Sequence, residues 1–356
     1  MTGPLCGVRV LEFGGIGPGP YCGQLLADLG GEVLLIDREG SNGWPNSVTD
    51  NCKSKLVLDV KTETGRERAL SAITCADVLI EGFRPGVMER LGLGPDVASK
   101  CNPRLIYGRM TGWGQQGPLA KAAGHDINYI ALTGALAAIG RSGDPAQPPL
   151  NLLGDFGGGS LFLALGIVCA LFEREQSGKG QVIDAAIIDG VSSMMSFFTG
   201  LAATGAISMD RGENLLGGHA PFYRCFKCSD GREIAIGSLE PHFYSDLLQR
   251  IGAPAEFNDR QNDASLWPER AAVLEVLFAT RSQAEWIATL EGTDVCFAPV
   301  LDLAEAANHP HMVARNVYRN VDGVQRPAPA PRFSRTPGSI QRSGDGEETL
   351  ARWLNA

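Results

Sequence analysis

Short runs of β-branched and other apolar residues alternate with helix-like stretches over the first part of the chain. These runs cover residues 8–13, 33–37, 78–80 and 105–107. Such alternation is typical of βαβ units, in which parallel strands form a sheet and the helices cover its faces. We therefore expect an α/β fold with a Rossmann-like parallel sheet.

Helical patterns become longer in the middle of the chain. Apolar positions at helical spacing extend over about residues 126–139 and 156–176, and residues 181–186 then have the pattern of one more strand. The most apolar run, residues 161–172, is shorter than the roughly 20 residues that cross a bilayer. We predict that this run forms a buried helix and that the protein has no membrane partner.

A smaller α+β domain is predicted in the second half of the chain. Residues 190–221 contain many small residues and two Gly-rich breaks, which favours a connection between domains. Two strand-like runs at 223–228 and 232–237 then flank a Ser-Asp-Gly turn, which predicts a hairpin. Helical segments from about 241 to 308 complete this domain.

Composition and charge limit the partners of this chain. The hydrophobic fraction of 44% and the charged fraction of 20% are ordinary for a globular protein. A net charge of -9 argues against nucleic acid and against an anionic membrane, because neither surface attracts an acidic protein. Nine scattered cysteines and an N-terminus without a basic-then-apolar signal favour a cytoplasmic protein with reduced thiols.

A glycine-rich segment follows the first predicted strand. Gly14 to Pro20 and Asp37 have the layout of a dinucleotide-binding fold, but the third glycine of G-x-G-x-x-G falls on Pro20 or Cys22. Two prolines also remove backbone N–H groups that a pyrophosphate would need. We therefore interpret the segment as a strand-to-helix turn rather than as a nicotinamide or flavin site.

Basic residues are concentrated in the first part of the sheet. Residues 38–109 contain 11 Lys or Arg against 9 Asp or Glu, an excess of positive charge in an acidic chain. Arg38 directly follows the second strand, where a doubly wound sheet meets an adenosine ribose. Lys61, Arg84 and Arg90 are further candidates. Each alone fits a solvated surface, but as a group they favour phosphate binding.

His125 and Asp155 each stand at the start of a predicted helix. The helix dipole at such a position disfavours an imidazolium and favours an ionised carboxylate. Three glycines at 157–159 leave the first turn after Asp155 without side chains, so another group must approach that backbone closely. The alternatives are a helix-capping histidine, and an N-cap aspartate beside a glycine-mediated helix contact.

Other candidate groups are weaker. Cys225 and Cys228 have the spacing of metal ligands, but no second suitable pair lies nearby, and we predict no metal site. Glu240 directly follows a predicted strand and is placed to deliver a carboxylate to a site between domains.

Several motifs together match a known family. They are residues 11–20, 36–38, 76–87, 110–115, 124–129, 154–160, 177–181, 240–241 and 329–335. Through them the chain resembles, nearly end to end, the class III coenzyme A transferase superfamily and, within it, the α-methylacyl-CoA racemases, particularly the mycobacterial form.

The resemblance implies a large Rossmann-like domain that a C-terminal segment rejoins, and an interlocked homodimer with active sites between protomers. The Pro-rich residues 327–332 suit such an extended return. The expected division is a large CoA-binding domain over 1–189 and 325–356, a connecting segment over 190–221, a small α+β domain over 222–308 and a return linker over 309–324.

The resemblance also assigns residues to the coenzyme A moiety of the substrate. They are Arg38, Leu58, Asp59, Val60, Lys61, Gly82, Phe83, Arg84, Arg90, Gly124, His125, Asp126, Ile127, Asn128 and Tyr129. The cations Arg38, Lys61, Arg84 and Arg90 are also those that the charge pattern selects.

The chemistry implied depends on His125. Transferases of this group generally carry an aromatic residue there and use the aspartate matching Asp155 as a nucleophile, whereas racemases keep the aspartate and add the histidine. The resemblance thus implies a 1,1-proton transfer at C2 of a 2-methylacyl-CoA, with Asp126 and the partner's Glu240 in support and no cofactor. The alternatives are a transferase, an acyl-CoA carrier protein and a nicotinamide oxidoreductase.

Overall fold

The structure is a computed structural model that describes residues 2–40, 46–50 and 52–356. Its described part divides into two compact units. Unit 1 comprises residues 1–133, 149–195 and 312–356, and unit 2 comprises residues 134–148 and 196–311. Residues 134–148, which the sequence assigns to the first domain, therefore belong to unit 2.

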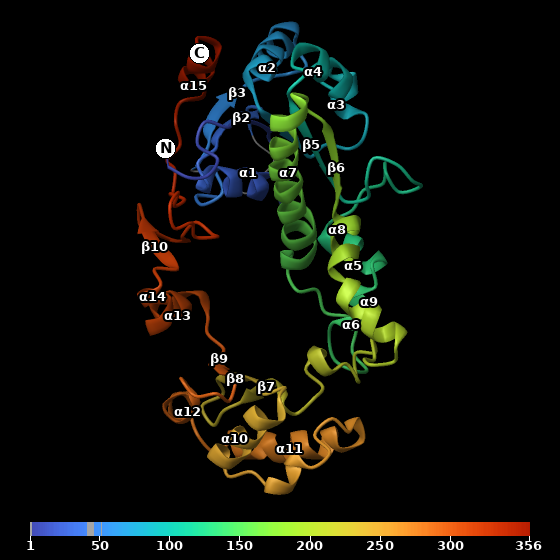
Figure 1. The fold of residues 1–356 in the computed structure, drawn as a ribbon, viewed down its shortest axis with the longest axis vertical. Coiled ribbons are helices and arrows are strands. Elements are labelled where there is room, and N and C mark those ends of the chain that lie inside the picture. The colour runs from blue at the N-terminus through green and yellow to red at the C-terminus, as the bar shows by residue number, and fades with distance from the viewer. Residues whose placement is uncertain (1, 41–45, 51) are drawn as a thin grey trace. The chain divides into compact units, whose positions relative to one another are not determined.

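Unit 1 is built on a six-stranded sheet in the order β3-β2-β1-β4-β5-β6, in which every pairing is parallel (Figure 1). The strands are β1 Arg9–Phe13, β2 Glu32–Asp37, β3 Ser54–Val57, β4 Val78–Glu81, β5 Ile106–Thr111 and β6 Val182–Ala186. This is the strand order of a doubly wound sheet. The predicted α/β class and parallel sheet are confirmed.

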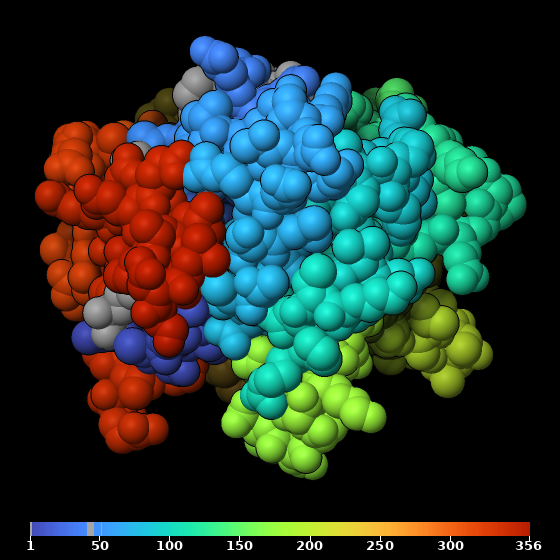
Figure 2. Space-filling model, turned by 90° about the horizontal axis from the view of Figure 1, so that it is seen from above, coloured from blue at the N-terminus to red at the C-terminus, as the bar shows by residue number. Residues whose placement is uncertain are grey.

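Alternation along the strands gives the sheet two buried faces. Tyr107 of β5 packs in a core with α2 Glu63–Cys75, α4 Pro95–Cys101 and α15 Gly346–Leu354. The next residue, Gly108, faces Leu163 of α7 Phe162–Ser177 on the opposite side. Figure 2 shows the red surface of α15 beside the light-blue surface of α2.

The remaining elements of unit 1 are short. They are α1 Pro18–Asp28, α3 Val87–Arg90, α5 Asp126–Leu132, the π-helical segment η1 Leu152–Leu161, α8 Ile187–Met194, and, towards the C-terminus, β10 Tyr318–Val321 and β11 Val324–Pro327. Helix α14 Pro310–Ala314 spans the boundary between the two units.

The two long helices expected in the middle of the chain differ from the prediction. The first ends at Leu132, because Gly134 adopts a left-handed backbone with φ 84° before α6 Ala135–Ala138 begins. The second begins earlier than residue 156, since η1 runs directly into α7 and extends the helical segment to Leu152–Ser177.

The apolar run 161–172 is not buried within this chain, contrary to the prediction. Leu163 and Ile167 pack fully into unit 1, but Leu161, Leu165, Val168 and Phe172 are 43–71% exposed on the other side of the helix. The prediction of a buried helix was wrong because both faces of α7 are apolar, although only one of them packs into unit 1. Leu152–Ser177 is also long and apolar enough to cross a bilayer by length and composition alone, so the absence of a membrane partner stays a prediction.

Unit 2 contains the predicted hairpin. β7 Tyr223–Lys227 and β8 Glu233–Gly237 pair antiparallel, and β9 Phe297–Pro299 adds a third strand that the sequence does not indicate. Its helices are α6, α9 Ser196–Ala203, α10 Pro241–Ile251, α11 Trp267–Phe278, α12 Gln283–Leu290 and α13 Leu303–Asn308, with 3₁₀ turns η2 Leu215–Gly217, η3 Ala255–Asn258 and η4 Ala264–Leu266.

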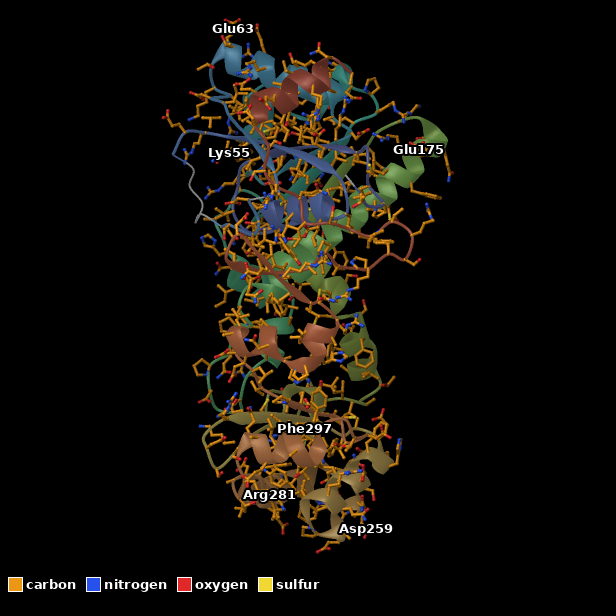
Figure 3. All side chains as sticks on the ribbon, turned by 90° about the vertical axis from the view of Figure 1, so that its left-hand side faces the viewer. Lys55, Glu63, Glu175, Asp259, Arg281 and Phe297 are labelled. Carbon is orange, nitrogen blue, oxygen red and sulfur yellow. The ribbon has the colours of Figure 1, made fainter. Side chains whose placement is uncertain are left out.

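Aromatic residues dominate the core of unit 2. Phe278 packs on Phe226 and edge-on against Trp286, with ring centroids 4.7 and 5.2 Å apart. Arg281, labelled in Figure 3, lies over the Trp286 ring at 4.8 Å. This small core therefore closes with a cation–π contact at its edge.

The close packing of α8 on η1 generates a stability prediction. A Cβ on Gly190 would lie 1.9 Å from the carbonyl oxygen of Gly158. Gly190→Ala should lower the free energy of unfolding by about 2–3 kcal/mol in urea denaturation, because the backbones must separate. Gly200→Ala in α9 is the matched control, since nothing lies within 4 Å of its Cβ position. Equal stability of both variants would contradict this packing.

Candidate functional site

The candidate site lies beyond the carboxyl end of the sheet, where a doubly wound fold binds ligands. β1 leads into the glycine-rich segment, and Gly17 forms the N-cap of α1 with φ 71°. A Cβ on Gly17 would lie 2.9 Å from an Asp155 carboxylate oxygen. The segment is a strand-to-helix turn as predicted, and the missing side chain at Gly17 lets Asp155 approach it.

η1 is fixed against the start of α1. The Ser160 hydroxyl donates to the Pro18 carbonyl at 2.7 Å, and the rings of Tyr21 and Phe156 pack 4.8 Å apart. The glycines that follow Asp155 serve this packing, because a Cβ on Gly158 would lie 2.5 Å from Val191 of α8. The group that approaches this backbone is therefore a neighbouring helix, which was the alternative explanation of the glycines.

His125 is the N-cap of α5, as the sequence predicts. Its backbone N–H donates to the side-chain oxygen of Asn128 at 3.0 Å. The Tyr129 hydroxyl donates to the carbonyl of Gly124, and the Tyr129 ring packs edge-on against Trp113 at 4.8 Å. The segment that carries the exposed imidazole is thus held at both of its ends.

Asp155 lies in the first turn of η1 rather than at a helix start, because the helical segment begins at Leu152, four residues before the expected residue 156. The side-chain amide of Asn151 donates to its carboxylate at 3.2 Å. Burial raises the pKa of Asp155, the Asp126 carboxylate raises it further, and Asn151 and His125 oppose the shift. The shift favours the protonated carboxyl, whereas the sequence suggested the ionised form.

Asp126 joins the two segments. Its Oδ1 accepts the backbone N–H of Asp155 at 2.6 Å. The approach needs a glycine, since a Cβ on Gly154 would lie 2.2 Å from that oxygen. Burial raises the pKa of Asp126. Its carboxylate is thus bound to the backbone of the other segment, and its support of His125 stays a prediction.

The predicted coenzyme A residues follow the ends of three strands, of which β3 and β2 are neighbours and β4 lies beyond β1. Arg38 comes after β2, residues 58–61 after β3, and residues 82–84 after β4, with Arg90 in α3. Arg38, Lys61, Arg84 and Arg90 are exposed, and no ion pair within the described residues occupies them.

Arg84 links the four exposed cations to the site of His125 and Asp155. Its charge opposes the rise in the pKa of Tyr129 that burial and the carboxylate of Asp155 cause. The remaining coenzyme A candidates, Ile127 and Asn128, are exposed on the first turn of α5. The structure thus brings the loop after β4 and the start of α5 to one place.

Glu240 belongs to unit 2, where it is the exposed N-cap of α10. Its support of His125 from a partner chain stays a prediction. Cys225 and Cys228 are free thiols on and just after β7. Sequence reasoning missed Asn151 and Gly17. Asn151 stands four residues before Asp155, so helical spacing was the available signal. The fold brings Gly17 to Asp155, and the glycine-rich turn was its signal.

Known proteins match nearly the whole length of this chain. The model of CoA-transferase family III matches residues 5–344. The alpha-methylacyl-CoA racemase of Mus musculus is 46% identical over 97% of this chain and 91% of its own length. The acetyl-CoA:oxalate CoA-transferase of Acetobacter aceti is 32% identical over 96% of this chain and 92% of its own length. A CAIB/BAIF family crystal structure from Brucella suis superposes with a TM-score of 0.84 at 25% identity, covering 99% of this chain and 100% of that one.

The burial of Asp155 generates a pH-dependent prediction. A raised pKa in the folded state means that the native protein loses stability as pH rises through that pKa. Asp155→Asn should therefore resist urea better than the unmodified protein at neutral pH, and the difference should vanish below about pH 4, where the carboxyl is protonated in both states.

Asp263→Asn is the control of opposite sign. Hydrogen bonds from Ser265 lower the pKa of Asp263, so this variant should lose stability at neutral pH and recover it in acid. An Asp155→Asn variant that is less stable than the unmodified protein at pH 7 would show that the carboxylate is stabilised rather than destabilised in the native state.

Proposed function

Because the chain belongs to CoA-transferase family III, we propose that it interconverts the 2R and 2S epimers of 2-methylacyl-CoA thioesters by a 1,1-proton transfer. The observation that carries the proposal is the hydrogen bond from the Asp155 backbone to Asp126 at 2.6 Å, which joins the segment of Asp155 to that of His125. The racemase name of the mouse relative supports the substrate class.

In the proposed reaction His125 takes the proton from one face of C2 while protonated Asp155 supplies a proton to the other, and the roles reverse for the opposite epimer. The raised pKa of Asp155 supports its protonated role. The α-anion spreads onto the thioester carbonyl as an enolate. Backbone N–H groups at the start of α5 or in the Gly157 region are suited to stabilise that oxygen.

The coenzyme A moiety of the substrate binds the protein and holds the acyl group in place. The proposed reaction needs no metal ion or redox cofactor. We assign the phosphates of coenzyme A to Arg38, Lys61, Arg84 and Arg90, since guanidinium and ammonium groups bind phosphate well. The exposed state of all four side chains supports this assignment. None of the described cysteines forms a disulfide, which supports the cytoplasm as the compartment.

The runner-up function is a coenzyme A transferase with Asp155 as nucleophile. The Acetobacter aceti relative, named as a transferase, supports it. Such an enzyme would form a mixed anhydride at Asp155 that hydroxylamine cleaves. An acyl-CoA carrier protein would show no turnover, and a nicotinamide oxidoreductase would bind a dinucleotide.

The proposed assembly is an interlocked homodimer in which Glu240 of the partner subunit supports His125. The exposed stripe of Leu161, Leu165, Val168 and Phe172 is uncharged, and a second copy offers the same apolar surface in a self-complementary contact. Contiguous apolar faces of this kind are typical of interfaces.

Incubation of a single epimer in heavy water tests the reaction. We expect deuterium at C2 together with loss of the initial configuration, measured by mass spectrometry and chiral chromatography. His125→Ala and Asp155→Ala should each lower the racemisation rate by roughly 10²–10⁴-fold, since each face needs its own acid–base group.

Two outcomes would replace this proposal. Retained protium and configuration, together with a hydroxylamine-sensitive acyl-enzyme that survives in His125→Ala but not in Asp155→Ala, would establish the transferase. Binding of acyl-CoA without any turnover would establish a carrier.

The exposed stripe on α7 generates a separate prediction about assembly. Leu165→Glu should halve the mass measured by light scattering, because a carboxylate would be buried in the contact between copies. Val276→Glu, at a 70% exposed apolar position in unit 2, is the matched control and should leave the mass unchanged. A monomeric unmodified protein would rule out the homodimer.

A further inference from the structure

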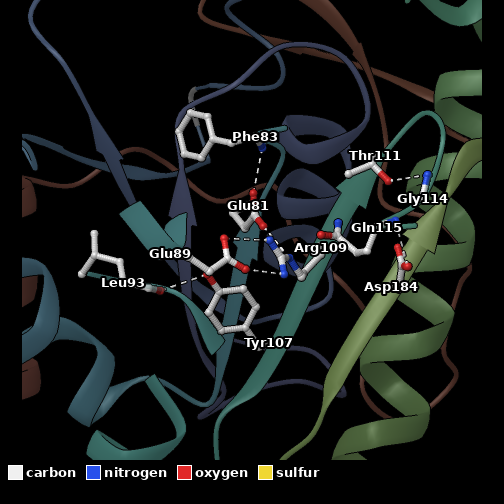
Figure 4. Close-up of polar contacts among 10 residues, drawn as sticks. All are labelled: Glu81, Phe83, Glu89, Leu93, Tyr107, Arg109, Thr111, Gly114, Gln115 and Asp184. Carbon is white, nitrogen blue, oxygen red and sulfur yellow. Dashed lines mark hydrogen bonds and ion pairs between the residues drawn. The ribbon is translucent and has the colours of Figure 1, made fainter. Parts of the chain in front are cut away.

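One buried arginine holds both ends of the loop after β4. Arg109 of β5 is 7% exposed, and its Nε donates to Glu81 at the end of β4 at 2.9 Å. Its two terminal nitrogens donate to the two oxygens of Glu89 in α3 at 2.8 and 3.3 Å (Figure 4). The guanidinium therefore bridges the first and nearly the last residue of the segment 81–90.

This bridge fixes the shape of the loop. The second oxygen of Glu81 accepts the backbone N–H of Phe83 at 2.7 Å, which orients the chain directly before Arg84. Glu89 directly precedes Arg90, so the bidentate pairing of Glu89 with Arg109 fixes the position of the backbone at Arg90. Arg84 and Arg90 are themselves exposed at the ends of these two connections.

The geometry requires an arginine. A guanidinium offers planar N–H groups in several directions at once, whereas a lysine ammonium is a point charge on a flexible stem. Glu81 is 1% exposed, and burial raises its pKa, so its ionised form depends on this partner. Nothing else among the described residues ties Glu81 to Glu89.

We propose that Arg109 is a positioning residue that holds Arg84 and Arg90 in place for the phosphates of coenzyme A. This inference rests on the proposed function, because it takes an acyl-CoA thioester as the substrate. Arg109 sets the affinity for the nucleotide end of that substrate and takes no part in the proton transfer at C2.

Paired substrates test this role. The rates of Arg109→Lys and Arg109→Met are compared on a 2-methylacyl-CoA and on the same acyl group carried by pantetheine, which lacks the nucleotide. KM for the CoA thioester should rise about tenfold or more with kcat nearly unchanged, because two phosphate contacts are displaced together. KM for the pantetheine thioester should change by less than about twofold, since those contacts are absent from it.

Arg174→Met is the matched control. Arg174 is also a buried arginine in unit 1, 6% exposed and paired with Asp77 at 2.9 Å, but it lies away from this loop. It should affect both substrates equally. Glu89→Gln removes one end of the bridge at a half-exposed carboxylate and should give the same selective rise in KM, even where Arg109→Met fails to fold.

Calorimetry with free coenzyme A and with pantetheine separates this inference from the proposed function. If the unmodified protein does not bind coenzyme A, the proposed function fails. If it binds coenzyme A and the Arg109 and Glu89 variants bind it equally well, or lose both ligands in proportion, the positioning role of Arg109 is overturned.

Discussion

The hydrogen bond from the Asp155 backbone to the Asp126 carboxylate is the contact on which the candidate site depends. It joins the start of α5, where His125 stands, to the π-helical turn that presents Asp155. A hydrogen bond to a charged acceptor in a partly buried place is among the stronger ones in proteins. Without it, the two acid–base groups would belong to separately placed helices, and their relative position would vary.

Close backbone approaches make this contact geometrically feasible. Gly154 admits the Asp126 carboxylate, Gly17 admits that of Asp155, and Gly158 and Gly190 let α8 lie against η1. Glycine within a helix costs about 1 kcal/mol relative to alanine, and a π-helical turn is rarer still. The fold accepts these local costs at one place, which is the candidate site.

The sequence predicts the sheet well and the site in part. Strands such as β1 and β2 are short, β-branched and bounded by turns, so local pattern and final structure agree. The predicted helix over 126–139 was wrong. The left-handed backbone of Gly134 ends the helical segment there, and the spacing of apolar residues does not reveal this conformation.

Site residues follow the same logic. His125 and Asp155 are recognisable from their residue types at predicted helix starts, but the pKa of Asp155 depends on burial, which arises only when α1, α5 and η1 meet. Arg109 contacts Glu81 and Glu89, which lie 28 and 20 residues away along the chain. The local sequence pattern does not predict these tertiary contacts.

The division of the chain has a consequence for its integrity. Thr133 is the last residue of unit 1 before an excursion through residues 134–148 of unit 2, and Pro149 begins the return. His125 and Asp155 therefore lie on opposite sides of that excursion along the chain. A single proteolytic cut between the units cannot separate unit 1 from unit 2, because the chain passes between the two units at further points.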